Sequence, residues 1–401
     1  MFSAVKPGPP DPMYLVKKAC DEDTDSRKVD LGVGIYRNEA GLYNELDCLK
    51  QAKVKLDELK LGHDYELTTG NKAFLQIAGD IMLGTECKRR RAKEVASVQT
   101  ISGTGANHLA ALLLAKCVSP RPKVYVGTPA WGNYKPLFET VGLEVVEYPF
   151  YDWANRAIDM KTTLQTINDA PAGSVFVLQG CCQNPAGADP TREQWEDIGR
   201  ALQAKKHLPF LDVAYQGLGN GLEEDVFAVR RFGDMGFDMF VCQSFSKNFG
   251  LYGERCGVLH VLCHGEEEAA NVQDRLRSLI RWEISSSPAY GARLVSIVHG
   301  SGALLENWQT ELSGMRTRMQ GLRKKLHGLL TETLKTPGKW DHILEETGLF
   351  SILSLSPEQC KRLISDFHIY LPQSGRINVS GLNEGNIRYV AEAIDSVVRG
   401  A

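Results

Sequence analysis

Short apolar runs alternate with helical patterns through the central part of the chain. Between these runs, residues 106–116 and 191–204 carry apolar side chains at helical spacing, and Asp189-Pro190 is a favourable start for the second helix. Continuous apolar strands separated by helices are typical of an α/β domain around a mostly parallel sheet. The runs predict strands at residues 124–128, 143–148, 175–178, 209–213, 239–243 and 257–262.

The pattern changes after about residue 300. Residues 304–331 predict one long amphipathic helix, because Trp308, Met315 and Leu322 recur on one of its faces. Two short strands and a closing helix follow, near residues 349–355, 377–379 and 384–398. We therefore expect a second, smaller α+β unit after the α/β domain.

The composition is that of a globular protein, with 43% hydrophobic and 24% charged residues among 401. A net charge of −3 gives no broad attraction to nucleic acid or to anionic membranes, so we expect neither partner, and a few placed cations must hold any anionic ligand. No apolar run approaches the ~20 residues that span a bilayer. Without a signal-peptide core or an Arg-rich leader before Asp11, we expect a soluble, cytoplasmic protein.

Ten cysteines are scattered along the chain without a CxxC pair. Cys256, His260, Cys263 and His264 lie along one predicted strand, where ~3.3 Å per residue separates them too far to share a metal. We predict reduced thiols and no metal site.

Residues suited to ligand chemistry follow several predicted strands. Lys247 stands in Ser244–Gly250 just past a strand, where ligands of α/β domains bind, and it could form a Schiff base or remain a solvated loop cation. Arg255 precedes the next strand, and its planar fork suits a phosphate. Asp212 ends another strand and needs a partner, either a protonated pyridine nitrogen or turn backbone.

Further strand ends carry polar or aromatic groups. Backbone N–H groups of Ser102, Gly103 and Thr104 could cradle a phosphate at a helix start, although Gly-Thr-Gly is also a fragment of a dinucleotide fingerprint that lacks its third glycine. Asn184 could donate to a ligand oxygen and Trp131 could stack on a ring, or both could serve turns and packing. Their joint occurrence favours a flat, phosphate-bearing ligand with a cationic nitrogen.

The chain resembles the aspartate aminotransferases, which are fold-type I pyridoxal-phosphate enzymes. The likeness runs from KVDLGVGIYR at 28–37 to SGRINVSG at 374–381, and SFSKNFGLYGER at 244–255 is specific to that family. The resemblance implies a mostly parallel seven-stranded sheet in a large domain at 41–305. The small α+β domain would combine an N-terminal segment, 1–40, with 306–401.

The family's chemistry would be transamination between an amino acid, expected to be dicarboxylic (aspartate or glutamate), and a 2-oxo acid such as 2-oxoglutarate or oxaloacetate. The cofactor would be pyridoxal 5′-phosphate, and the active sites would be shared within a homodimer. Lys247 would bind the cofactor covalently and carry the proton, Asp212 would pair with the pyridinium nitrogen, and Tyr215 and Asn184 would bind the phenolic oxygen. The resemblance assigns the phosphate to Ser102, Gly103, Thr104, Ser244, Arg255 and, from the other subunit, Tyr65.

The resemblance also implies a substrate site. Arg376 would bind the α-carboxylate, and Arg281 would reach across the dimer interface to a side-chain carboxylate. Trp131 would stack on the cofactor ring, and it would line the substrate site together with Gly34, Asn184 and Phe350.

The chain departs from the family pattern at three positions that usually carry histidine, here Tyr134, Gln179 and Gln183. We expect weaker support for the pair between Asp212 and the pyridine nitrogen, and the effect on reaction type and rate stays open. Two alternatives follow: decarboxylation, elimination or C–C bond formation on an aspartate-like substrate, or a catalytically weak binding paralogue. A nicotinamide dehydrogenase is a more distant alternative.

Overall fold

The computed structural model describes residues 1–400 and divides the chain into two compact units. One unit contains residues 44–317 and 346–348, and the other contains residues 1–43, 318–345 and those from 349 onward. The boundary at 317/318 falls within one long helix, α12 (Gly302–Gly328), which the sequence predicts at 304–331. A π-helical turn, Leu329–Thr333, follows it directly.

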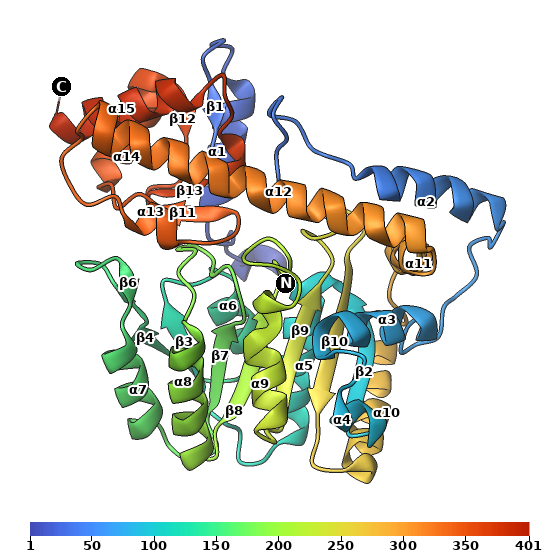
Figure 1. Ribbon diagram of the computed structural model, residues 1–401. Coiled ribbons are helices and arrows are strands. Elements are labelled where there is room, and N and C mark those ends of the chain that lie inside the picture. The colour runs from blue at the N-terminus through green and yellow to red at the C-terminus, as the bar shows by residue number, and fades with distance from the viewer. Residues whose placement is uncertain (401) are drawn as a thin grey trace. The chain divides into compact units, whose positions relative to one another are not determined.

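A seven-stranded sheet forms the centre of the first unit, in the order β2-β10-β9-β8-β7-β3-β4 (Figure 1). Neighbouring strands from β4 to β9 pair in parallel, whereas β10 is antiparallel to both β9 and β2. The expected mostly parallel seven-stranded sheet is therefore confirmed. The strands are β2 (Val95–Ile101), β3 (Val124–Thr128), β4 (Val145–Pro149), β7 (Val175–Gln179), β8 (Leu208–Val213), β9 (Met239–Ser244) and β10 (Cys256–Leu262).

Helices cover both faces of this sheet (Figure 1). The buried helix α5 (Ser102–Cys117) packs on β2, β9 and β10 and contacts α6 and α10, while α8 contacts both α7 and α9. A capping box, in which Thr191 and Gln194 satisfy each other's backbone N–H groups, starts α8 (Arg192–Ala204) close to the predicted position. The other elements of this unit are α2 (Asp47–Glu58), α3 (Lys72–Leu83), α4 (Lys88–Arg91), β5 (Tyr151–Asp152), β6 (Ala157–Ile158), α6 (Tyr134–Thr140), α7 (Met160–Asp169), η2 (Glu224–Val226), α9 (Phe227–Asp234), α10 (Glu266–Glu283) and α11 (Ala289–His299).

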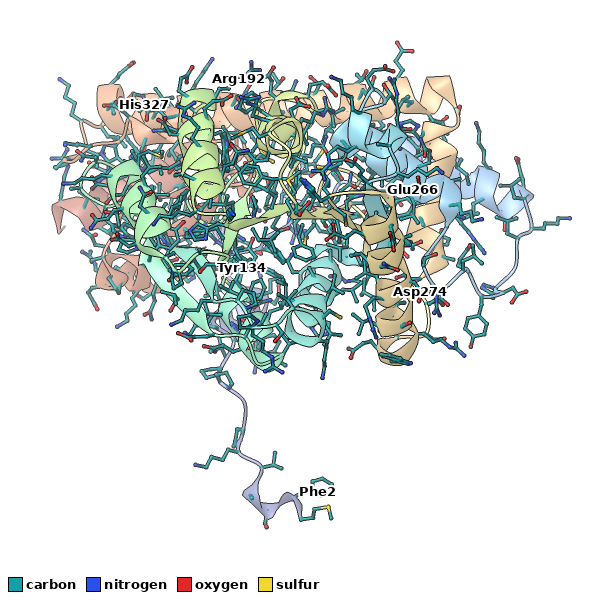
Figure 2. The ribbon with its side chains drawn as sticks, turned by 90° about the horizontal axis from the view of Figure 1, so that it is seen from below. Phe2, Tyr134, Arg192, Glu266, Asp274 and His327 are labelled. Atoms are coloured by element: carbon teal, nitrogen blue, oxygen red, sulfur yellow. The ribbon has the colours of Figure 1, made fainter. Side chains whose placement is uncertain are left out.

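The second unit is a smaller α+β assembly with two short two-stranded sheets. In one, β1 (Val29–Asp30) is parallel to β12 (Ile369–Tyr370), and in the other, β11 (Phe350–Ile352) is antiparallel to β13 (Arg376–Asn378). Residues 1–10 are exposed, and Phe2 lies at the tip of this projecting segment (Figure 2). The helical elements are η1 (Phe2–Ala4), α1 (Pro12–Glu22), α13 (His342–Glu345), α14 (Pro357–Phe367), η4 (Val379–Gly381) and α15 (Ile387–Arg399).

Among residues 1–400, no helix combines the length and apolarity that crossing a membrane requires.

Candidate active site

A pocket of about 110 Å³ lies at the carboxyl edge of the seven-stranded sheet. The ends of β7, β8 and β9 reach it with Gln179, Asp212 and Ser244. Because β10 runs antiparallel, its first residues meet the same edge and bring Arg255 there. The lining residues are Ser102, Gly103, Thr104, Trp131, Gln179, Cys181, Asn184, Asp212, Ala214, Tyr215, Ser244, Ser246, Lys247, Tyr252 and Arg255.

Ten of the predicted site residues therefore line one pocket: Ser102, Gly103, Thr104, Trp131, Asn184, Asp212, Tyr215, Ser244, Lys247 and Arg255. Sequence reasoning missed Cys181, Ala214, Ser246 and Tyr252. Ser246 stands inside the Ser244–Gly250 segment, so its hydroxyl beside Lys247 was the available signal. The other three carry no pattern that marks them.

Lys247 carries the pocket's amine. Burial lowers the pKa of Lys247 to about 8, a change that the Asp212 carboxylate opposes and the Arg255 guanidinium reinforces. Its Nζ lies 5.2 Å from the centroid of the Tyr215 ring. A lysine with this pKa has a neutral, nucleophilic fraction near neutral pH, as attack on a carbonyl carbon requires.

Asp212 is buried, and its two oxygens differ. The Tyr134 hydroxyl donates to Oδ2 at 2.6 Å, whereas Oδ1 has no hydrogen-bond partner among the described residues. Burial raises the pKa of Asp212, and the Tyr134 hydroxyl is the strongest influence in the opposite direction. An unpartnered carboxylate oxygen in a pocket is costly unless a cationic donor meets it.

The start of α5 forms a concave surface for an anion. Ser102 has a φ of 62°, its backbone N–H donates to the Arg255 carbonyl at 2.9 Å, and its hydroxyl lies 3.1 Å from that of Ser246. A Cβ on Gly103 would lie 3.0 Å from Ser244 Cβ, which is a tight contact, and 4.0 Å from Asp212 Oδ1, so a side chain at this position would crowd the surface. Free N–H groups at a helix start attract phosphate. The Ser102 N–H is taken by Arg255, contrary to the sequence expectation, so Ser102 can offer only its hydroxyl, and backbone contacts to a phosphate fall to Gly103 and Thr104.

The three positions that usually carry histidine make specific contacts. Tyr134 donates directly to Asp212. The expectation of weaker support for Asp212 did not take into account that a phenol, like a histidine, can donate a hydrogen bond there. Gln179 pairs with the backbone of Asn184 through two hydrogen bonds, of 3.0 and 2.9 Å. Gln183 donates to the Pro129 carbonyl at 2.6 Å and accepts from the Ala186 N–H at 2.8 Å.

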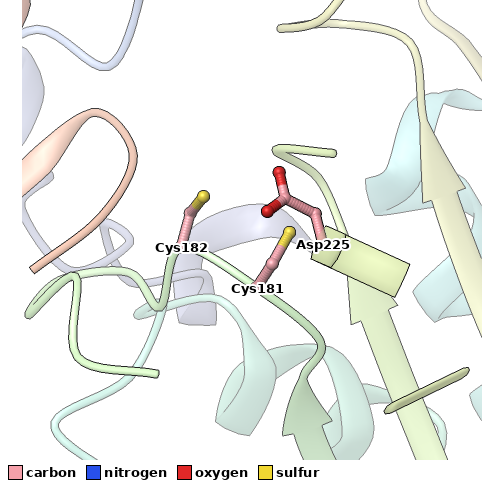
Figure 3. Close-up of side chains that lie close together, drawn as sticks. All are labelled: Cys181, Cys182 and Asp225. Carbon is pink, nitrogen blue, oxygen red and sulfur yellow. The ribbon is translucent and has the colours of Figure 1, made fainter. Parts of the chain in front are cut away.

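A cluster of Cys181, Cys182 and Asp225 places its sulfur and oxygen atoms within 4.8 Å of one another (Figure 3). The Asp225 carboxylate already accepts three backbone N–H groups, from Gly217, Gly219 and Asn220. Burial raises the pKa of the Cys182 thiol to about 11, so it is protonated at neutral pH. We interpret Asp225 as the cap of this turn, and the absence of a bound metal stays a prediction.

The remaining predicted residues lie outside the pocket lining. Tyr65 is 85% exposed, and Arg281 is exposed on α10 and donates to the Ser285 hydroxyl at 2.6 Å. In the other unit, Arg376 lies over the Phe350 ring at 4.3 Å and donates to the Gly32 carbonyl at 2.8 Å. A Cβ on Gly34 would lie 3.7 Å from Phe350, so these three predicted residues form one local cluster.

Comparison with known proteins gives the class of this fold and pocket. The family described as aminotransferase class I and II matches residues 26–394. The aminotransferase tasG of Hapsidospora irregularis is 45% identical over 99% of this chain and 96% of its own length. The mitochondrial aspartate aminotransferase of Dictyostelium discoideum is 40% identical over 99% of this chain and 93% of its own.

A solved structure gives the same answer. The aromatic-amino-acid aminotransferase of Burkholderia pseudomallei, which is covalently bound to pyridoxal phosphate, superimposes with a TM-score of 0.97 at 36% identity over 99% of both chains. The fold is therefore that of the fold-type I pyridoxal-phosphate enzymes, as the sequence predicted. The chain belongs to the class I and II aminotransferase family and is a pyridoxal-phosphate-dependent transaminase.

Proposed function

We propose that this transaminase transfers the amino group of a dicarboxylic amino acid, aspartate or glutamate, to a 2-oxo acid. One observation carries the proposal: the pocket joins the Lys247 amine, an unpartnered Asp212 oxygen and an open helix start beside Arg255. Pyridoxal phosphate has one group for each of these, namely an aldehyde, a ring nitrogen and a phosphate. The relative from Dictyostelium discoideum, named an aspartate aminotransferase, supports the substrate class.

The lining residues fit the cofactor because each polar group meets a suitable partner. Asp212 Oδ1 would pair with the protonated ring nitrogen, Trp131 would cover the ring, and Tyr215 with Asn184 would bind the phenolic oxygen. When bound, the cofactor supplies an electron sink for the electron pair released at the substrate Cα. The phosphate would be held by Ser102, Gly103, Thr104, Ser244 and Arg255.

Lys247 would move the proton. Its pKa of about 8 allows the free amine to accept a proton from the substrate Cα and to donate it again later in the same half-reaction. Arg255 contributes to that low pKa, so the cation that would hold the phosphate also favours the neutral amine. Donor and acceptor would then react in alternating half-reactions at one site.

Substrate selection would rest on two arginines. Arg376 would bind the substrate's α-carboxylate, with Phe350 and Gly34 beside it. Arg281 of a second copy of the chain would bind the substrate's side-chain carboxylate. The exposure of Tyr65 and Arg281 is compatible with residues that serve a partner subunit. We therefore propose a homodimer with shared active sites.

We also propose that the two compact units are the large and small domains expected from the sequence, with α12 common to both. A cytoplasmic location is proposed as well, and the ten unpaired cysteines suit it. A mitochondrial matrix would suit them equally, so cell fractionation decides between the two.

Product analysis tests the reaction. Purified protein loaded with pyridoxal phosphate is supplied with aspartate, with and without 2-oxoglutarate. We expect oxaloacetate and glutamate in equal amounts, and turnover only when the acceptor is present. Release of alanine and CO₂ without an acceptor would instead identify decarboxylation. Phenylalanine in place of aspartate tests whether the aromatic preference named for the Burkholderia relative also occurs here.

A further inference from the structure

Three uncharged side chains lie around the pocket: Tyr134 donates to Asp212, Gln179 bonds to the Asn184 backbone, and Gln183 precedes Asn184 and bonds to Pro129. Each donates one hydrogen bond, and none is a histidine. Their contacts have a common effect, which is to fix groups that line the pocket.

The Tyr134 side chain is held firmly. It is 2% exposed, and its ring meets the Trp131 ring edge-on, with centroids 5.2 Å apart and planes at 90°. This packing fixes the direction of the hydroxyl, which donates to Asp212 Oδ2 at 2.6 Å. Because Oδ2 is occupied, Oδ1 is the oxygen left for a ligand.

The two glutamines fix the neighbouring turn. The Gln179 amide pairs with both the N–H and the C=O of Asn184, and Gln179 stands beside Asp212 in the register of β7 and β8. Gln183 joins this turn to Pro129, just before Trp131. One set of neutral hydrogen bonds therefore connects the groups that would contact the ring.

We propose that Tyr134 is a positioning residue for Asp212, whose uncharged hydrogen bond occupies one carboxylate oxygen and directs the other to the cofactor's ring nitrogen. This inference rests on the proposed function of the pocket. It assigns Gln179 and Gln183 the parallel task of holding the Asn184 turn without adding charge.

The groups facing Asp212 come from several elements: Asn107 from α5, Tyr134 from α6, Cys242 from β9, and Lys247 after β9. The pKa values of Tyr134 and Cys242 are raised well above their usual range, mainly by burial. Both groups therefore stay neutral and add no negative charge beside Asp212. The hydrogen bond from Tyr134 thus stabilises the charged carboxylate at every pH at which Asp212 is ionised.

The test compares Tyr134→Phe with Tyr148→Phe. Tyr148 is also a buried tyrosine, but its hydroxyl has no partner among residues 1–400, which makes it a matched control. We expect Tyr134→Phe to raise the dissociation constant of pyridoxal phosphate roughly 10-fold or more, since a hydrogen bond to a charged group is lost. Tyr148→Phe should leave it unchanged, and Tyr134→His, which keeps a donor, should recover part of the loss.

A second readout uses the full chain without cofactor. Burial raises the pKa of Asp212, so lowering the pH protonates it and removes the charge that the donor stabilises. The melting temperature of Tyr134→Phe should therefore fall further below wild type at about pH 8 than at the lowest pH at which both proteins stay folded. A merely structural hydroxyl would give the same difference at both pH values. If Tyr134→Phe does not fold, the same comparison is made with Tyr134→His and in an Asp212→Asn background. There the pH dependence of the effect of residue 134 should vanish, because an amide does not titrate.

The outcomes separate the two proposals. If wild type fails to bind pyridoxal phosphate, the proposed function is wrong. If wild type binds it and Tyr134→Phe behaves like Tyr148→Phe in affinity and in pH dependence, only the role of Tyr134 is overturned.

Discussion

Replacing Lys247 with methionine should stabilise the cofactor-free protein. Burial lowers the pKa of this amine from 10.5 to about 8, so the folded state disfavours the charged form. A pKa lowered by about 2.5 corresponds to roughly 3 kcal/mol, because each pH unit is worth about 1.4 kcal/mol. Methionine has a similar length and no charge. Since Asp212 loses a favourable neighbour, we expect a net gain of about 1–3 kcal/mol at neutral pH.

The pH dependence gives this prediction a distinct signature. Below about pH 8 the amine is protonated in both the folded and the unfolded state, and the folded protein bears the full cost. Between about pH 8 and 10.5 the folded state loses the proton while the unfolded state keeps it, so wild type gains stability as pH rises. The advantage of Lys247→Met should therefore be largest below about pH 8 and should vanish by about pH 10.5.

Denaturant unfolding of the two cofactor-free proteins, followed by tryptophan fluorescence across this pH range, measures the difference. Lys161→Met, at an exposed position of α7, is the control and should show no pH-dependent gain. A Lys247→Met protein that is less stable than wild type, or whose advantage is constant with pH, would refute the account of a destabilised amine.

Three further predictions follow from the pocket and its turns. Gly103→Ala should weaken pyridoxal phosphate binding about 10-fold, because its Cβ would lie 3.0 Å from Ser244 Cβ; an unchanged dissociation constant would contradict this. Asp225→Ala should lower the free energy of unfolding by about 1–3 kcal/mol, since three backbone N–H groups lose their acceptor. Denaturant titrations measure this change, and Asp197→Ala, at an exposed position, is the control. Arg281→Leu should lower kcat/KM for aspartate ~30-fold or more and for phenylalanine far less, because only the side-chain carboxylate of aspartate loses a paired cation. Equal losses would show that Arg281 does not bind the substrate's side chain.

The sequence identifies most of the sheet because its strands are uninterrupted apolar runs. It misses β2, where Ser97, Gln99 and Thr100 break the run. The structure supplies the reason for two of them: Ser97 bonds to His260, and the Gln99 side chain accepts from the Asn71 N–H. Buried polar side chains with specific partners look like loop residues in a sequence.

Much of the pocket was predictable for a different reason. Parallel strands share a carboxyl edge, so residues following different strands must meet there, as Asp212 and Lys247 do. The resemblance placed Tyr134 near Asp212, although the two lie 78 positions apart in the chain. The hydrogen bond from its hydroxyl was not predictable, because the directions of side chains depend on packing. The roles of Tyr65 and Arg281 remain predictions, because a single chain contains no partner subunit.

The most direct test of the central claim is the reaction of the cofactor-loaded protein with aspartate alone, recorded by absorption spectroscopy and product analysis. We predict that the visible band of the lysine-bound cofactor is replaced by that of its amine form, that one equivalent of oxaloacetate appears, and that borohydride reduction before aspartate is added labels Lys247. An unchanged spectrum with no oxaloacetate, or a label on another lysine, would contradict the assignment of this chain as a dicarboxylate transaminase acting through Lys247.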